Sequence, residues 1–194
     1  METEETYTPE VKDREPVLWI YLSGGIEAAP DKGVGWRDTI TPWLKERGFY
    51  PVNPIDFDKS IEYPDKLVDG KLNYEPVREA FASTVHRDLA LVHDCDVVVC
   101  LWDEAAANGA GTHGELTFAF KNDIPVIILN KTGTDIPAWI IGCSTYICSS
   151  MEELRGFLAC IYAREILEHD VVRNEGTIPI DRYNRVIIEE TESD

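Results

Sequence analysis

The sequence predicts a doubly wound α/β domain, in which helices cover both faces of a parallel sheet of about five strands. Short, continuously apolar runs are bounded by turn residues, a pattern typical of strands buried on both faces. Segments with helical periodicity alternate with these runs along most of the chain. At 194 residues the chain fits a single core better than two.

The predicted elements follow one another as strand, helix and strand from the first apolar run onward. Residues 17–22, VLWIYL, form the first strand, and a helix over 36–48 leads into a second strand over 49–53. The remaining strands are predicted at 96–102, 125–130 and 144–148. One further helix is predicted to end near Asp94, and two others cover 112–122 and 150–169. This alternation is typical of flavodoxin-like and Rossmann-like sheets.

Three segments fall outside this pattern. Residues 1–16 are polar and acidic and predict a flexible arm before a single domain at 17–170. Residues 54–74 are rich in Pro, Asp and Lys and predict a lid. The tail at 171–194 carries a short apolar run at 185–190, which predicts a homo-oligomer in which the tail contacts a neighbouring subunit.

Composition limits the classes of partner. A formal net charge of -18 repels nucleic-acid polymers and anionic membranes, although a local pocket can still hold a small anion. The chain shows neither an export signal nor an apolar stretch of about 18 residues. Its 5 cysteines lack a C-x-x-C pair. We therefore expect reduced thiols, a cytoplasmic location and no membrane partner.

The loop after the first strand is one candidate binding site, because open α/β sheets bind ligands at the carboxyl ends of their strands. Ser23, Gly24 and Gly25 come directly after the apolar run, so backbone amides could approach a ligand closely. A plain tight turn is the structural alternative. Arg37, in the next helix, could reach into the same site.

The loop after the strand at 96–102 is the other candidate, and it leads into a helix expected to start near Thr112. Glu115 then falls in the first turn, where exposed amides and the helix dipole favour the ionised carboxylate that a nucleophile needs. The alternative is a capping box, in which Glu115 bonds back to Thr112. The predicted ligand-binding residues of this loop are Trp102, Asp103, Asn108, Gly109, Gly111 and Thr112.

Three stretches, taken in order, resemble the nucleoside 2-deoxyribosyltransferase family and the related 2'-deoxynucleoside 5'-monophosphate N-glycosidases. They read YLSGGIEAAP, HRDLALVHDCDVVVCLW and GAGTHGELTFAFKNDIPVIIL, and the match covers residues 17–148. The resemblance implies cleavage or transfer of an N-glycosidic bond in nucleotide salvage, with a small nucleoside or nucleotide as ligand. It implies that Glu115 forms a covalent glycosyl intermediate and that Asp88 assists the leaving base or orients the sugar. Neither a cofactor nor a metal is expected.

The position of Asp88 raises a geometric difficulty. In one unbroken helix from Pro76, Asp88 would lie about 17 Å below the top of the sheet, too far from Glu115. We therefore expect a helix break near Ser83 and Thr84. The alternative for Asp88 is a solvent-facing residue paired with Arg87.

Other departures concern the ligand. Glu27 stands in the first loop where the phosphate-binding relatives carry Arg, and this predicts nucleosides rather than 5'-monophosphates. Gly109 replaces the Ser or Asp that the relatives place six residues before the nucleophile. Tyr21 and Trp102 are the candidates for stacking on the base, although core packing is the alternative for both. A 5'-monophosphate N-glycosidase and a non-catalytic nucleotide-binding or sensing domain remain alternative functions.

Two further motifs are excluded. His86-Arg87-Asp88-Leu89 resembles a kinase catalytic loop, but the D-F-G and the Gly-rich loop of kinases are missing. The spacing of Cys143 and Cys148 does not give the P-C-x-x-C of zinc deaminases.

Overall fold

A parallel sheet forms the centre of the computed structural model, which describes residues 18–58 and 64–175. Its strands are β1 (Leu18–Gly24), β2 (Phe49–Val52), β5 (Val97–Leu101), β6 (Val126–Leu129) and β7 (Tyr146–Cys148). They lie in the order β2-β1-β5-β6-β7, and all neighbouring pairs are parallel. The connection changes direction between β1 and β5, and the carboxyl ends of these two strands are therefore the expected ligand position.

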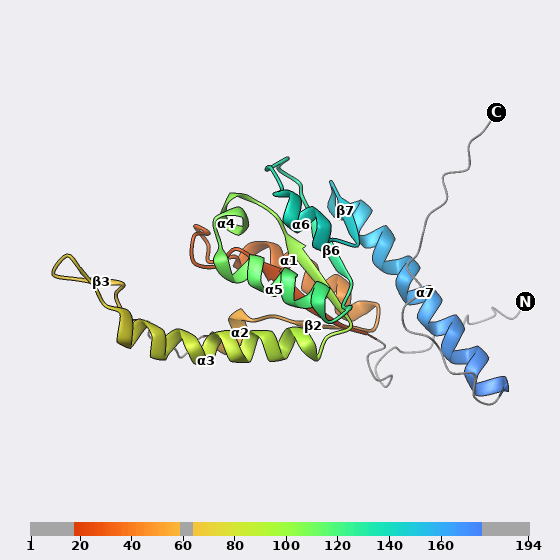
Figure 1. Cartoon of the computed structure of the whole chain (residues 1–194). Coiled ribbons are helices and arrows are strands. Elements are labelled where there is room, and N and C mark those ends of the chain that lie inside the picture. Colours follow the sequence, from red (N-terminus) through yellow and green to blue (C-terminus); the bar gives the residue numbers. More distant parts are fainter. Residues whose placement is uncertain (1–17, 59–63, 176–194) are drawn as a thin grey trace, which may run out of the picture.

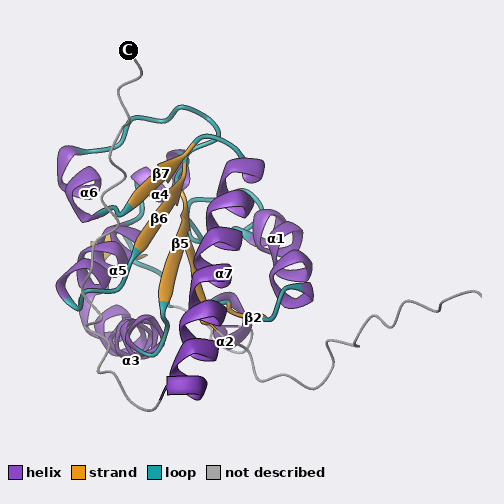
Figure 2. Ribbon diagram, turned by 90° about the vertical axis from the view of Figure 1, so that its right-hand side faces the viewer, coloured by secondary structure: helices purple, strands orange, loops and turns teal. Residues whose placement is uncertain are grey.

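Helices cover both faces of this sheet, as Figure 2 shows. One face carries α1 (Val34–Glu46) and α7 (Met151–Glu175), and the other carries α3 (Tyr74–His93), α5 (Ala110–Lys121) and α6 (Ala138–Cys143). The prediction of a doubly wound sheet of about five strands is confirmed.

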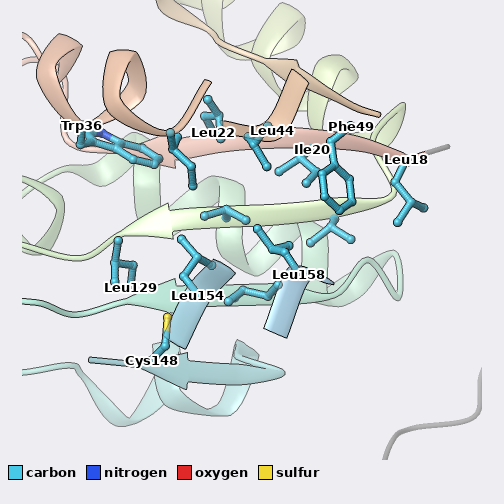
Figure 3. Close-up of a cluster of buried hydrophobic side chains, with 14 residues drawn as sticks. Leu18, Ile20, Leu22, Trp36, Leu44, Phe49, Leu129, Cys148, Leu154 and Leu158 are labelled. Atoms are coloured by element: carbon cyan, nitrogen blue, oxygen red, sulfur yellow. The ribbon is translucent and has the colours of Figure 1, made fainter. Parts of the chain in front are cut away.

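The period of two along β1 divides its side chains between the two faces. Leu18, Ile20 and Leu22 are buried with Leu44 of α1 and Leu154 of α7, and Figure 3 shows these side chains gathered over the sheet. The intervening positions face the side of α3 and α5, where Tyr21 belongs to the second buried cluster. This alternation brings the side chains at positions 21 and 23 of β1 toward α5.

Helix α3 is continuous, so the predicted break near Ser83 and Thr84 is wrong. Ser83 Oγ donates a 3.0 Å hydrogen bond to the Ala80 carbonyl inside the helix and caps no new one. Figure 1 shows that the first turns of α3 project well beyond the edge of the sheet. Because the helix begins beyond the sheet rather than level with its top, Asp88 reaches the level of the site without a break.

The segment predicted as a lid contains regular structure on both sides of residues 59–63, which lie outside the described residues. It begins with the short helix α2 (Ile55–Asp58) and ends with a hairpin of β3 (Leu67–Val68) and β4 (Lys71–Leu72). The hairpin sits at the projecting end of α3 in Figure 1.

The predicted arm at 1–16 and the apolar run at 185–190 both lie outside the described residues. Helix α7 continues to Glu175, past the predicted boundary at 170, so the first residues assigned to the tail are helical.

Candidate active site

Two hydroxyl groups of β1 hold the carboxyl group of Glu115. Tyr21 Oη donates a 2.8 Å hydrogen bond to Oε1, and Ser23 Oγ donates a 2.6 Å hydrogen bond to Oε2. Tyr21 and Ser23 have no exposed surface, and Glu115 is only 9% exposed. A buried carboxyl group is thus fixed through both oxygens next to the carboxyl end of β1.

Helix α5 places Glu115 differently from the prediction. The helix begins at Ala110 with Gly109 as its N-cap, so Glu115 lies in the second turn rather than the first. No side chain caps the helix, so the alternative of a capping box between Thr112 and Glu115 is not found. The short helix α4 (Glu104–Ala107) explains the earlier start, because the chain passes from it into α5 through Gly109.

Burial controls the ionisation of Glu115. The pKa of Glu115 is raised to about 7, chiefly by the loss of solvent, although the hydrogen bonds from Ser23 and Tyr21 act in the opposite direction. The prediction that the amides of the first turn favour the ionised carboxylate does not apply, because Glu115 lies in the second turn. Near neutral pH the protonated and ionised forms of Glu115 are both populated.

Asp88 of α3 lies near enough for its charge to raise the pKa values of both Glu115 and Tyr21. Its side chain is only 16% exposed, so it does not face solvent. Arg87 Nε and Nη2 donate 2.9 and 2.8 Å hydrogen bonds to Asp88 Oδ1, as the structural alternative expected. The charge of Asp88 therefore acts on Glu115, the other carboxyl group that the sequence predicted as catalytic.

Arg37 has a structural position instead of the predicted contact with a ligand. Its side chain has no exposed surface. The guanidinium donates to the carbonyl groups of Leu22, Gly24 and Gly33 at 2.8 to 3.2 Å. These bonds fix the backbone at both ends of the first loop, so the prediction that Arg37 reaches into the site is wrong. Its positive charge still lowers the pKa of Glu115.

The glycines of the first loop allow it to pack against α4. Gly24 has a φ of 145°, a conformation that side chains disfavour. A Cβ atom on Gly25 would lie 2.5 Å from the Cβ atom of Ala105. The two loops predicted to bind the ligand therefore touch each other, and close packing accounts for Gly25 without a ligand.

Several predicted ligand-binding residues shape the second loop. Asp103 caps α4 by accepting a 2.9 Å hydrogen bond from the Ala106 amide. The Asn108 side chain donates to the Glu104 carbonyl at 2.8 Å. Thr112 is buried, whereas Gly111 has open space where a side chain would stand. The ligand-binding roles proposed for Asp103, Asn108, Gly109, Gly111 and Thr112 remain predictions.

The two aromatic candidates for base stacking are both buried. The indole N–H of Trp102 donates a 2.9 Å hydrogen bond to the Asp135 carbonyl, and its ring stacks on His113 at 5.3 Å. Tyr21 uses its hydroxyl on Glu115. Neither ring has an exposed face for a base, so the prediction of base stacking is wrong for Trp102 and Tyr21.

One charged contact at the site was not predicted. Lys66, just before β3, forms an ion pair with Glu27 of the first loop. The segment predicted as a lid therefore contacts the first loop, and Lys66 offsets part of the negative charge there. A conspicuous unpaired carboxylate in the first loop was the only sequence signal for this contact.

Within residues 18–58 and 64–175, no group of three or more His, Cys, Asp or Glu side chains is arranged to hold a metal ion. The helices described there include none that is long and apolar enough to cross a membrane.

No protein-family model matches the chain, and no curated protein matches it. Among solved structures, a 2-deoxyribosyltransferase from Bacillus psychrosaccharolyticus superimposes with a TM-score of 0.55 at 14% identity, covering 71% of this chain and 90% of that one. A CMP N-glycosidase of Clostridium botulinum gives a TM-score of 0.45 at 16% identity, covering 74% and 98% of the two chains. The first comparison shows that the chain has the fold that the sequence resemblance implies.

Proposed function

We propose that this protein cleaves or transfers the N-glycosidic bond of a small 2'-deoxynucleoside, with Glu115 as the nucleophile. The observation that carries the proposal is the buried carboxyl group of Glu115, held through both oxygens at the edge of the sheet where such folds bind ligands. A carboxylate in this setting can attack a carbon atom that develops positive charge. The fold shared with a 2-deoxyribosyltransferase supports the same chemistry.

The reaction proceeds in two steps. The ionised oxygen of Glu115 forms a bond to C1' of the sugar as the bond from C1' to the base nitrogen breaks, and the bonding electrons leave with the base. A proton from Asp88 or from water neutralises the departing base. Water or a second base then attacks C1' and gives up a proton to Asp88 or to water, and the electron pair of the ester bond returns to the Glu115 carboxylate. Loss of the 2'-hydroxyl eases formation of the oxocarbenium-like transition state, so a simple carboxylate site suffices.

Asp88 is the second carboxylate of this mechanism. Its charge acts on both Tyr21 and Glu115, which supports a role for Asp88 at the same sugar. We assign it either to proton transfer with the departing base or to holding a sugar hydroxyl. The neighbouring Arg87 guanidinium fixes its orientation through two hydrogen bonds.

Nucleosides are the favoured substrates over 5'-monophosphates. Arg37 is committed to backbone carbonyl groups, so it is not available for a phosphate. Glu27 adds negative charge to the first loop. The alternative function, a 5'-monophosphate N-glycosidase, is favoured by one observation, the presence of Lys66 beside Glu27.

A substrate panel tests the proposal. Purified protein is incubated with deoxynucleosides and their 5'-monophosphates, with and without a second free base, and released or exchanged base is measured by chromatography. Base release without acceptor indicates a hydrolase, and exchange that needs an acceptor indicates a transferase. If no compound is turned over but some bind, the non-catalytic nucleotide-binding domain is the better description.

A further inference from the structure

We propose that Ser23 is a positioning residue for Glu115, whose hydroxyl holds Oε2 and keeps the carboxylate oriented for attack. The inference deepens the proposed function and rests on it for its catalytic meaning. The contact itself is the shorter of the two hydrogen bonds to Glu115, 2.6 Å against 2.8 Å from Tyr21. Short O–H···O bonds of this kind are typical of an ionised acceptor.

The sequence position of Ser23 argues for a specific purpose. It follows an apolar run on a strand that is buried on both faces, where a hydroxyl has no packing advantage over an apolar side chain. Burying a hydroxyl group is costly unless it finds a hydrogen-bond partner. The Ser23 hydroxyl finds that partner in Glu115, itself a buried polar group. A fold stabilised only by packing needs neither group, so the pair points to the chemistry of the site.

Cys100 of β5 is the cross-strand partner of Ser23, and it does not compete strongly with Glu115 for the Ser23 hydroxyl. Burial strongly raises the pKa of the Cys100 thiol, and the charge of Glu115 raises it further. The thiol is therefore neutral at physiological pH, and a neutral sulfur is a weak hydrogen-bond acceptor. Glu115 is the stronger acceptor for the Ser23 proton.

Tyr21 and Ser23 each bond a different oxygen of the Glu115 carboxyl group. Tyr21 alone would hold Oε1 as a single pivot, about which the carboxyl plane could turn. The bond from Ser23 to Oε2 provides a second point and fixes that plane. Both donors also favour the charged form of Glu115, because each donates a proton toward the carboxylate.

Replacement of Ser23 by Ala tests the assignment. Loss of one donor disfavours the ionised carboxylate, and the pKa of Glu115 should rise. We expect the acidic limb of the pH profile of kcat/KM to move to higher pH by about one unit, equivalent to about tenfold lower activity on that limb. Cys148→Ala is the matched control, since it also removes a buried donor from a strand, the one that bonds the Ile128 carbonyl, without contact with Glu115. The control should lose stability without any shift in the pH profile.

An infrared titration separates this inference from the proposed function. The carboxyl band that disappears in Glu115→Gln reports the protonation of Glu115 directly, whether or not any substrate is turned over. In Ser23→Ala this band should titrate at higher pH than in the wild type and in Cys148→Ala. An unchanged titration in Ser23→Ala would overturn the positioning role, even in an active enzyme. A shifted titration in a protein without glycosidic activity would uphold the contact and refute the proposed reaction.

Discussion

The hydroxyl of Tyr21 on β1 and the carboxyl group of Glu115 on α5 are joined by a 2.8 Å hydrogen bond across 94 residues of sequence. The bond lies inside the packed layer between the sheet and the helix, where neither side chain has much access to water. Glu115 is consequently an ionisable group in the protein interior as well as a candidate nucleophile, and its ionisation has consequences for stability as well as for catalysis.

Glu115→Gln should make stability less dependent on pH. The folded-state pKa of about 7 lies above the ordinary value of 4.5, so between these values the folded state binds more protons than the unfolded state. For such a raised acid, the stability penalty is absent below about pH 4.5, develops as pH rises, and is complete above about pH 7. The wild type should therefore lose about 3 kcal/mol more than the variant across this window. Chemical denaturation at pH 5 and pH 8 measures the difference, and equal losses in both proteins would contradict the shifted pKa.

Asp88→Asn should slow base release strongly and leave substrate binding nearly intact, because the amide keeps the shape of the side chain but not its charge or proton. Removing the Asp88 charge should also lower the pKa of Glu115, so the acidic limb should move to lower pH. This direction is opposite to the one expected for Ser23→Ala. Steady-state kinetics over pH, with the exposed Asp94→Asn as control, provide the measurement. A wild-type rate would assign Asp88 a purely structural role.

Nucleosides should have higher kcat/KM values than the matching 5'-monophosphates. The negative charge of Glu27 opposes a phosphate group, and Arg37 cannot compensate because it is buried. Glu27→Gln should reduce the preference for nucleosides over 5'-monophosphates, whereas Lys66→Gln should increase it. Competition assays with both substrates in one reaction measure the ratio of the two kcat/KM values. Monophosphates preferred by more than tenfold would make the N-glycosidase alternative the better account.

Deletion of residues 176–194 should reduce both oligomer mass and activity if the tail completes a neighbouring site. The truncated chain keeps every described element, because α7 ends at Glu175. Mass in solution is measured beside base release, and the melting temperature checks that the domain is intact. A fully active, monomeric truncated protein would show that the tail has no role in assembly or in the site.

Patterns of apolar residues were sufficient to predict the sheet. In the run 96–102, Val97, Val98, Val99, Cys100 and Trp102 are buried in the structure, so burial and β propensity act in the same direction. The break in α3 was predicted because the helix was assumed to begin level with the sheet. Its overhang depends on how α3 packs on α5, and no local pattern encodes that position.

The sequence predicted residues that lie near one another, whereas their roles at a site remain predictions. Tyr21 and Ser23 are hydrogen-bonded to Glu115, and the charge of Asp88 acts on the same group. The family resemblance pointed to Glu115 and Asp88, and the binding of ligands at the carboxyl ends of strands pointed to Ser23. Arg37 has the residue type of an anion ligand, but its burial is a tertiary property that one sequence cannot reveal. Positions 21 and 23 share one face of β1, because side chains alternate along a strand. Once α5 is known to cover that face, hydrogen bonds from Tyr21 and Ser23 to Glu115 follow.

The rate of base release by Glu115→Gln, relative to the wild type, tests the central claim most directly. Glutamine keeps the size of the side chain and can still bond Tyr21 and Ser23, but it cannot form the glycosyl ester. Glu104→Gln, an exposed Glu on α4, is the matched control and should retain activity. We predict that Glu115→Gln folds, binds nucleoside and releases base about a thousandfold more slowly or not at all. Release at a rate close to that of the wild type by the folded variant would contradict the assignment of Glu115 as the nucleophile.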